Sequence, residues 1–133
     1  MASGFLFPLA AGAQIVNAIE NPIGNTAVKV EKLIWTKPTP SSPVAISFVV
    51  KNNTLKGEIN TVQFMLVARN KNNVILQNDG ATLRKLSGNT TILPGETGTV
   101  SFDKAFTVDQ IDSIELKQVI VQFTNGSLEI LKN

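Results

Sequence analysis

Three residue types that carry much of enzyme chemistry are missing from this chain. Its 133 residues include no cysteine, no histidine and no tyrosine. Without cysteine there is no disulfide, no thiol catalysis and no thiolate metal site. Without histidine there is no imidazole base, no Ser-His pair and no His-ligated metal. We therefore predict a protein that is not an enzyme and that holds no cofactor and no resident metal.

Charge is also scarce. Charged residues make up 17% of the chain, and the net charge is +2. The usual charged share is about a quarter, and a small, evenly spread excess of one sign does not favour nucleic-acid binding. Hydrophobic residues make up an ordinary 43%. A chain of this length forms one domain with its own core, and its uncharged polar surface is typical of an all-β protein.

The clearest pattern runs from Val44 to Leu76. Apolar residues alternate with polar ones on both sides of the turn formers Asn52-Asn53-Thr54 and Lys56-Gly57-Glu58. Period-two alternation places each apolar set on one face of a strand. We interpret the stretch as the central antiparallel pair of a β-sandwich. With later strands it predicts a shared core of Ile46, Phe48, Val50, Val62, Phe64, Leu66, Val100, Val121 and Phe123.

In two other predicted strands, the alternation of apolar residues shifts by one position partway along. Thr26 to Trp35 changes phase at Glu31-Lys32, and Ile114 to Phe123 changes near Lys117-Gln118. One extra residue in a strand shifts the phase in this way, so we predict a β-bulge at each place. Trp35, at the end of its alternating strand, is expected in the core.

Turn signals divide the rest of the chain. Pro94-Gly95 predicts a type II turn, and Asn125-Gly126 a two-residue hairpin. Val74 to Leu76 is expected to be a short strand, residues 81–86 a brief edge strand and residues 87–91 a loop. About seven short strands with frequent turns predict an immunoglobulin-like antiparallel β-sandwich.

The first residues differ from this pattern, and we divide the chain into an apolar N-terminal arm, residues 1–24, and a sandwich, residues 25–133. The arm lacks the basic n-region of a complete signal peptide. Three interpretations stay open, namely packing on its own domain, burial against a neighbouring subunit, and membrane contact. Apolar patches of this kind mark interaction sites. The predicted partner-binding residues are Phe5, Leu6, Phe7, Leu9, Ile15, Val16 and Ile19.

The one tight acidic group is Asp109 and Asp112, with Glu115 nearby. A carboxylate pair at the right separation could hydrolyse glycosides, and carboxylates also bind hard cations such as calcium. The interpretation we favour is that these are solvated charges in a loop that leads into a strand.

Residues from about Ala45 to Ile130 resemble the small bacterial immunoglobulin-like domains named for the FxLyD motif. The resemblance rests on residues 49–54 (VVKNNT), 62–69, 93–96 (LPGE) and 121–127 (VQFTNGS). The pattern is also similar to the late-embryogenesis-abundant type 2 fold. Arg69-Asn70 stands where the FxLyD family usually has an aromatic-acidic pair. The resemblance implies a sandwich fold and brings no catalytic residue with it.

Two functions are consistent with these features. The first is a non-catalytic structural subunit of a larger assembly, such as a phage virion, a tail or a filament, joined to protein subunits of the same or another kind through its arm. The alternative, implied by the resemblance, is a cell-surface or periplasmic binding module. No small-molecule substrate is expected. A virion or extracellular assembly is the favoured location.

Overall fold

The strands form two antiparallel sheets. The computed structural model describes residues 15–17, 23–25, 27–36, 44–78, 80–106, 108 and 110–132, and for residues 15–17 it describes the backbone alone. No helix occurs within these residues. The nine strands are β1 (Ile15–Asn17), β2 (Ile23–Gly24), β3 (Val28–Thr36), β4 (Ile46–Asn52), β5 (Ile59–Arg69), β6 (Arg84–Ile92), β7 (Thr97–Phe102), β8 (Ser113–Phe123) and β9 (Leu128–Lys132).

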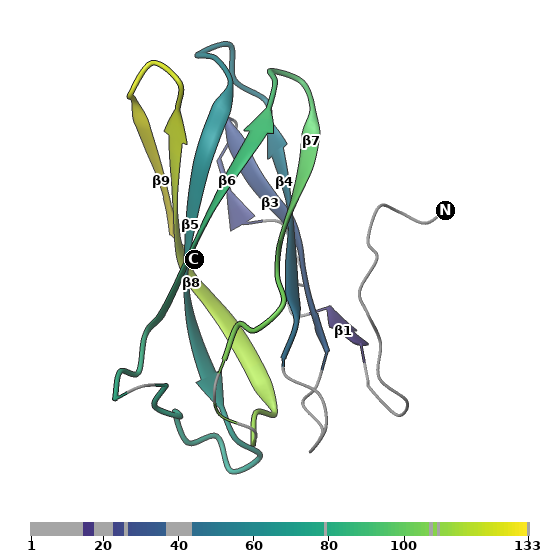
Figure 1. Cartoon of the computed structure of the whole chain (residues 1–133), viewed down its shortest axis with the longest axis vertical. Helices are drawn as coiled ribbons and strands as arrows, with labels where there is room; N and C mark the ends of the chain where they lie inside the picture. The colour runs from purple at the N-terminus through teal and green to yellow at the C-terminus, as the bar shows by residue number, and fades with distance from the viewer. Residues whose placement is uncertain are drawn as a thin grey trace.

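The two sheets pack face to face (Figure 1). In one sheet β4 lies between β3 and β7, and both β1 and β2 pair with the other side of β3. The second sheet has the order β6-β5-β8-β9. Apolar side chains from both inner faces form one buried cluster. The predicted all-β class and β-sandwich architecture are therefore confirmed.

The predicted pairing of the two strands in Val44–Leu76 is wrong. β4 pairs with β3 and β7, whereas β5 pairs with β6 and β8. The residues between them cross from one sheet to the other. Each strand has one apolar face, and the two faces meet across the interior from opposite layers. Alternation of apolar residues is the same for a strand that pairs with its neighbour and for one that faces it.

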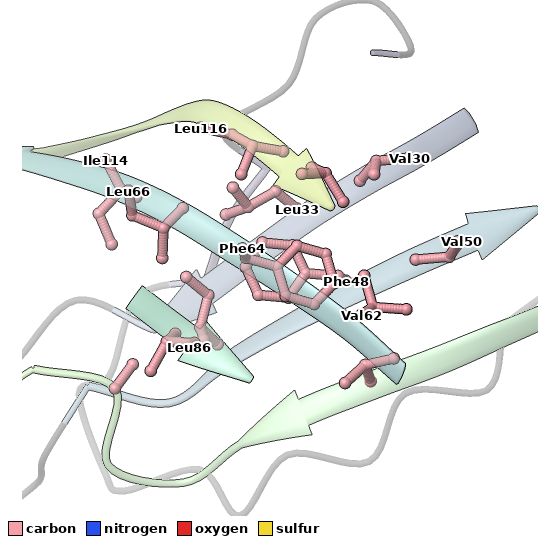
Figure 2. Close-up of a cluster of buried hydrophobic side chains, with 14 of the residues drawn as sticks. Val30, Leu33, Phe48, Val50, Val62, Phe64, Leu66, Leu86, Ile114 and Leu116 are labelled. Carbon is pink, nitrogen blue, oxygen red and sulfur yellow. The ribbon is translucent and has the colours of Figure 1, made fainter. Parts of the chain in front are cut away.

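The predicted core is confirmed. All nine residues named from the sequence belong to the buried cluster, and Trp35 is buried with them. Figure 2 shows Phe48 of β4 and Phe64 of β5 overlapping in the middle of this cluster. Phe48 and Phe64 are both fully buried, so the aromatic contact lies at the centre of the sandwich.

Both predicted bulges are present. The register of β3 against β4 shifts between Val30 and Lys32, so that Glu31 is the extra residue. The register of β5 against β8 shifts where Met65 faces Gln118 and Leu66 faces Leu116, so that Lys117 is the extra residue. An added residue restores the inward direction of the apolar side chains that follow it.

β6 is longer than the sequence predicts, because it includes the residues 87–91 that were expected to form a loop. It is an edge strand, as expected for its first part. Its inner face carries Gly88, where a Cβ atom would lie 2.7 Å from Val100 of β7. Gly98 of β7 faces Ile92 of β6 in the same way, at 2.6 Å. Two glycines thus let the edges of the two sheets approach closely.

Two predicted turns and one predicted short strand have different outcomes. The type II turn is supported, because Glu96 N donates to Leu93 O and Gly95 has φ 84°. The two-residue hairpin is wrong. Phe123 N donates to Ser127 O, which leaves three residues in the loop, with Gly126 at φ 88°. The strand predicted at Val74–Leu76 is reduced to an isolated bridge between Arg69 and Ile75.

Candidate interaction surface: the loop end of the sandwich

The structure does not bring the predicted partner-binding residues together within its described part. Ile15 and Val16 lie in β1, where their backbones pair with Thr36 and Trp35 of β3. Phe5, Leu6, Phe7, Leu9 and Ile19 lie outside the described residues, as do the side chains of Ile15 and Val16. The pairing of β1 nevertheless shows where the N-terminal arm joins the sandwich, which is the outer edge of a sheet.

In the described part of the chain, Asp112 and Glu115 make different side-chain contacts. Asp109 lies outside it. Asp112 lines an open cleft of about 440 Å³, together with Asn70, Lys71, Asn72, Gln110 and Ile111. Glu115 instead binds Arg69, at 2.6 Å, and Lys117, at 3.3 Å. The hydrogen bond from Arg69 lowers the pKa of Glu115.

No group of three or more side chains able to hold a metal occurs among the described residues. In the same part of the chain no helix is long and apolar enough to cross a membrane. The calcium and glycoside-hydrolysis alternatives both involve Asp109, which lies outside the described residues.

A network of side-chain hydrogen bonds joins the loops at one end of the sandwich. We call it the loop end and define it as residues 53–58, 93–96 and 124–127 together with Asn25. It contains the connections β4–β5, β6–β7 and β8–β9, which lie at the same end of the molecule (Figure 1). Turn formers dominate these segments, and the side chains of three asparagines hold them together.

Asn52, at the end of β4, is fully buried. Its side-chain Nδ2 donates to Gly57 O at 2.9 Å and to Ile92 O at 3.0 Å, and its Oδ1 accepts from Thr54 N at 3.1 Å. Its backbone also bonds to Gly95 and Glu96. An amide with two donors and an acceptor can satisfy all these groups at once. Asn52 thus joins the β4–β5 loop to the β6–β7 turn.

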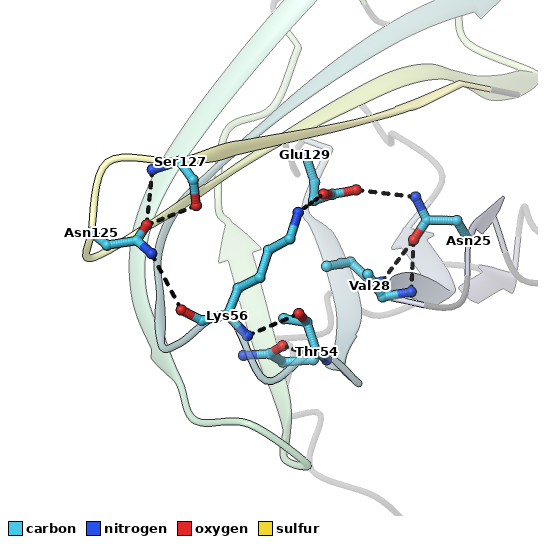
Figure 3. Close-up of polar contacts among 9 residues, drawn as sticks. Asn25, Val28, Thr54, Lys56, Asn125, Ser127 and Glu129 are labelled. Atoms are coloured by element: carbon cyan, nitrogen blue, oxygen red, sulfur yellow. Dashed lines mark hydrogen bonds and ion pairs between the residues drawn. The ribbon is translucent and has the colours of Figure 1, made fainter.

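Asn125 and Asn25 join the remaining segments (Figure 3). Asn125 Nδ2 donates to Lys56 O, while its Oδ1 accepts from Ser127. Asn25 Oδ1 accepts from Val28 N, and its Nδ2 donates to Glu129. Side-chain amides that mimic turn hydrogen bonds fix loop geometry without regular structure.

Glu129 on β9 completes the network by binding Lys56 as well as Asn25. The hydrogen bond from Lys56, followed by that from Asn25, lowers the pKa of Glu129. Lys56 is therefore a paired cation. Glu129 lies on the edge strand β9, where a charged residue also discourages pairing with foreign strands.

Three leucine side chains are exposed in or next to this hydrogen-bonded loop end. Leu55, at the tip of the β4–β5 loop, is 95% exposed. Leu93, on the β6–β7 turn, is 44% exposed, and Leu128, which follows the β8–β9 loop, is 55% exposed. The sequence reasoning did not single out these residues. The available signal is one apolar residue, Leu55, between the turn formers Asn52-Asn53-Thr54 and Lys56-Gly57-Glu58.

Comparison with known proteins identifies no relative. No protein-family model matches the chain, and neither a curated protein nor a solved structure matches it significantly.

Proposed function

We propose that this protein is a non-catalytic structural subunit of a larger assembly, such as a phage virion, a tail or a filament, and that it joins neighbouring protein subunits through its N-terminal arm. The observation that supports this proposal most directly is the position of β1. It pairs with the outer side of β3 at the edge of a sheet, and the apolar residues Phe5, Leu6, Phe7 and Leu9 precede it in the chain.

The described core adds a second argument. Both inner faces of the sandwich are already covered by a continuous cluster of buried side chains. Apolar arm residues that this interior does not cover would form a surface patch larger than soluble monomers usually tolerate. Burial against another subunit removes such a patch from water at about 25 cal/mol per Å².

Two shortened chains test the arm. One begins at Ile15 and keeps β1, and the other begins at Asn21 and lacks it. Light scattering with size-exclusion chromatography should show that the full chain assembles and that both shortened chains are folded monomers. Retention of the full-length mass in both shortened chains would contradict the proposal, because the arm would then be dispensable for association.

The second candidate is a binding module of the FxLyD type. It is favoured by the strand order, because β5, β8 and β9 lie side by side as strands C, F and G do in immunoglobulin sandwiches. The hydrogen-bonded loop end offers such a module a preorganised binding surface. Equal masses of the full and shortened chains would place this candidate first.

A further inference from the structure

The start of β1 and the loop end lie at opposite ends of β3. β3 starts at the loop end, where Val28 faces Asn52, and finishes at Thr36. Its nine residues span about 30 Å at the usual rise of a strand. Ile15 faces Thr36. Residues 1–14 therefore precede a strand that starts beside the end of β3 opposite the loop end.

The segment before β1 is uncharged and mostly apolar. Residues 1–19 contain no charged side chain, and the segment before β1 carries two phenylalanines and two leucines, namely Phe5, Phe7, Leu6 and Leu9. Fourteen residues can extend over about 45 Å. The segment is thus long enough to reach across an end-to-end contact into a neighbouring copy.

The loop end offers an exposed apolar side chain on an ordered loop. Leu55 is almost fully exposed, yet its loop is held on both sides, because Lys56 N donates to Thr54 Oγ1 and Thr124 N donates to Glu58 O. A surface that is already ordered loses little conformational entropy on binding. The cation next to Leu55 is paired with Glu129, and Glu58 and Glu96 lie in the same surface, which disfavours an anionic lipid or nucleic acid.

We infer that the loop end of one copy, with Leu55 at its centre, binds residues 1–14 of a second copy. The head-to-tail contact rests on the proposed function, because it requires association through the arm, and it adds the surface that receives the arm. Since the arm and the receiving surface are different parts of the chain, each copy can bind two neighbours. Such heterologous contacts produce filaments or closed rings instead of stopping at a dimer.

Two full-length variants test this contact. Leu55→Asp removes the receiving patch and leaves the arm intact. The arm variant Phe5→Ser, Phe7→Ser, Leu9→Ser removes the arm patch and leaves the loop end intact. Each variant alone should be monomeric, with a dissociation constant raised about 10- to 100-fold, as loss of a buried leucine implies. Mixed in equal amounts, they should form a one-to-one dimer, because one arm and one receiving patch remain functional.

A matched control is Val74→Asp, which replaces an exposed apolar loop residue outside the loop end (55% exposed) and should leave assembly unchanged. Circular dichroism establishes that each variant is folded. Assembly of Leu55→Asp to the wild-type mass, or a mixture that stays monomeric, would overturn the head-to-tail contact. If the Leu55→Asp chain assembles while the arm variant does not, the arm proposal stands and the loop end is not the receiver. A monomeric wild-type chain would overturn both.

Discussion

The rings of Phe48 and Phe64 are stacked, with their centroids 3.6 Å apart and their planes inclined by 7°. Both rings meet Phe102 edge-on, at 6.1 Å and 6.2 Å between centroids. Phe48 and Phe102 belong to one sheet and Phe64 to the other. The three aromatic side chains therefore connect the two layers, and the edge-on contact of Phe64 with Phe102 contributes attraction between the sheets beyond the burial of its area.

Replacing Phe64 by alanine should strongly destabilise the fold. Loss of a buried phenylalanine usually lowers the free energy of unfolding by about 3–5 kcal/mol. Chemical denaturation measures this loss. Met65→Ala is the control, because Met65 is only partly buried on the adjacent position of β5. A loss below about 1 kcal/mol for Phe64→Ala would contradict the central position of the ring.

Substitution of Asn52 should lower the free energy of unfolding as much as substitution of a core residue does, although Asn52 is polar. Asn52→Leu leaves the carbonyls of Gly57 and Ile92 without a donor, and buried unpaired groups of this kind should lower the free energy of unfolding by about 2–4 kcal/mol in total. Urea denaturation of the variant measures the loss. Asn53→Ala is the control, because the Asn53 side chain is exposed.

Asn52→Asp keeps the size and shape of the side chain but removes the amide that donates its hydrogen bonds. The introduced carboxylate would face two carbonyl oxygens in a buried site, which raises its pKa. A raised pKa in the folded state means that the penalty grows as pH rises above the unfolded value of about 3.9. The deficit of this variant relative to wild type should therefore decrease as pH falls toward about 4 and be smallest below that value. A deficit that is constant with pH would contradict the network.

Two lysines face each other across β3 and β4, because Lys29 is the direct register partner of Lys51. Like charges directly opposite destabilise a sheet. Lys51→Glu should raise the free energy of unfolding by about 0.2–1 kcal/mol at low salt, and Lys51→Gln should give a smaller gain. Thermal denaturation at two salt concentrations measures both, and the gain should decrease with salt. A loss of stability in Lys51→Glu would refute the repulsion.

Acid should weaken the two carboxylate contacts. Glu115 and Glu129 have pKa values lowered by Arg69 and by Lys56 respectively. A lowered pKa in the folded state gives stability that is present above the ordinary value of about 4.3 and is lost as pH falls through the folded value.

The free energy of unfolding, measured by urea titration between pH 6 and pH 2, should decrease below about pH 4.5. Glu129→Gln should flatten this decrease, by less than about 1 kcal/mol because the pair is close to solvent. Glu58→Gln is the control, since Glu58 forms no ion pair among the described residues. An identical decrease in Glu129→Gln and wild type would exclude a contribution from Glu129.

The sequence predicted the strands and the core because both depend on side-chain direction. Phe48 and Phe64 had to point inward in any sandwich in which their strands alternate. The partner of each strand was not predictable in this way, because the residues between Asn52 and Ile59 can form either a hairpin or a crossing. Hydrogen bonds from Asn52 to the distant Ile92 and Glu96 accompany the crossing, and such long-range contacts have no local signature.

Other differences have similar causes. The middle of β6 resembled a loop because Ser87 and Asn89 face solvent, while Gly88 faces inward, where a side chain would collide with β7. The loop end was missed because Leu55 is a single apolar residue among turn formers. Its significance depends on the exposure of its side chain and on the rigidity of its loop, which arise only after distant segments meet.

The crossing between β4 and β5 has a kinetic consequence. Each central strand has one partner close in sequence and one far away, since Ile46 faces Phe102 and Thr61 faces Gln122. Local hairpins such as β3–β4 and β8–β9 can form within microseconds, whereas distant pairings must first close long loops. We expect refolding in the range of milliseconds to seconds, as for other sandwiches of high contact order, with β7 and β8 joining last.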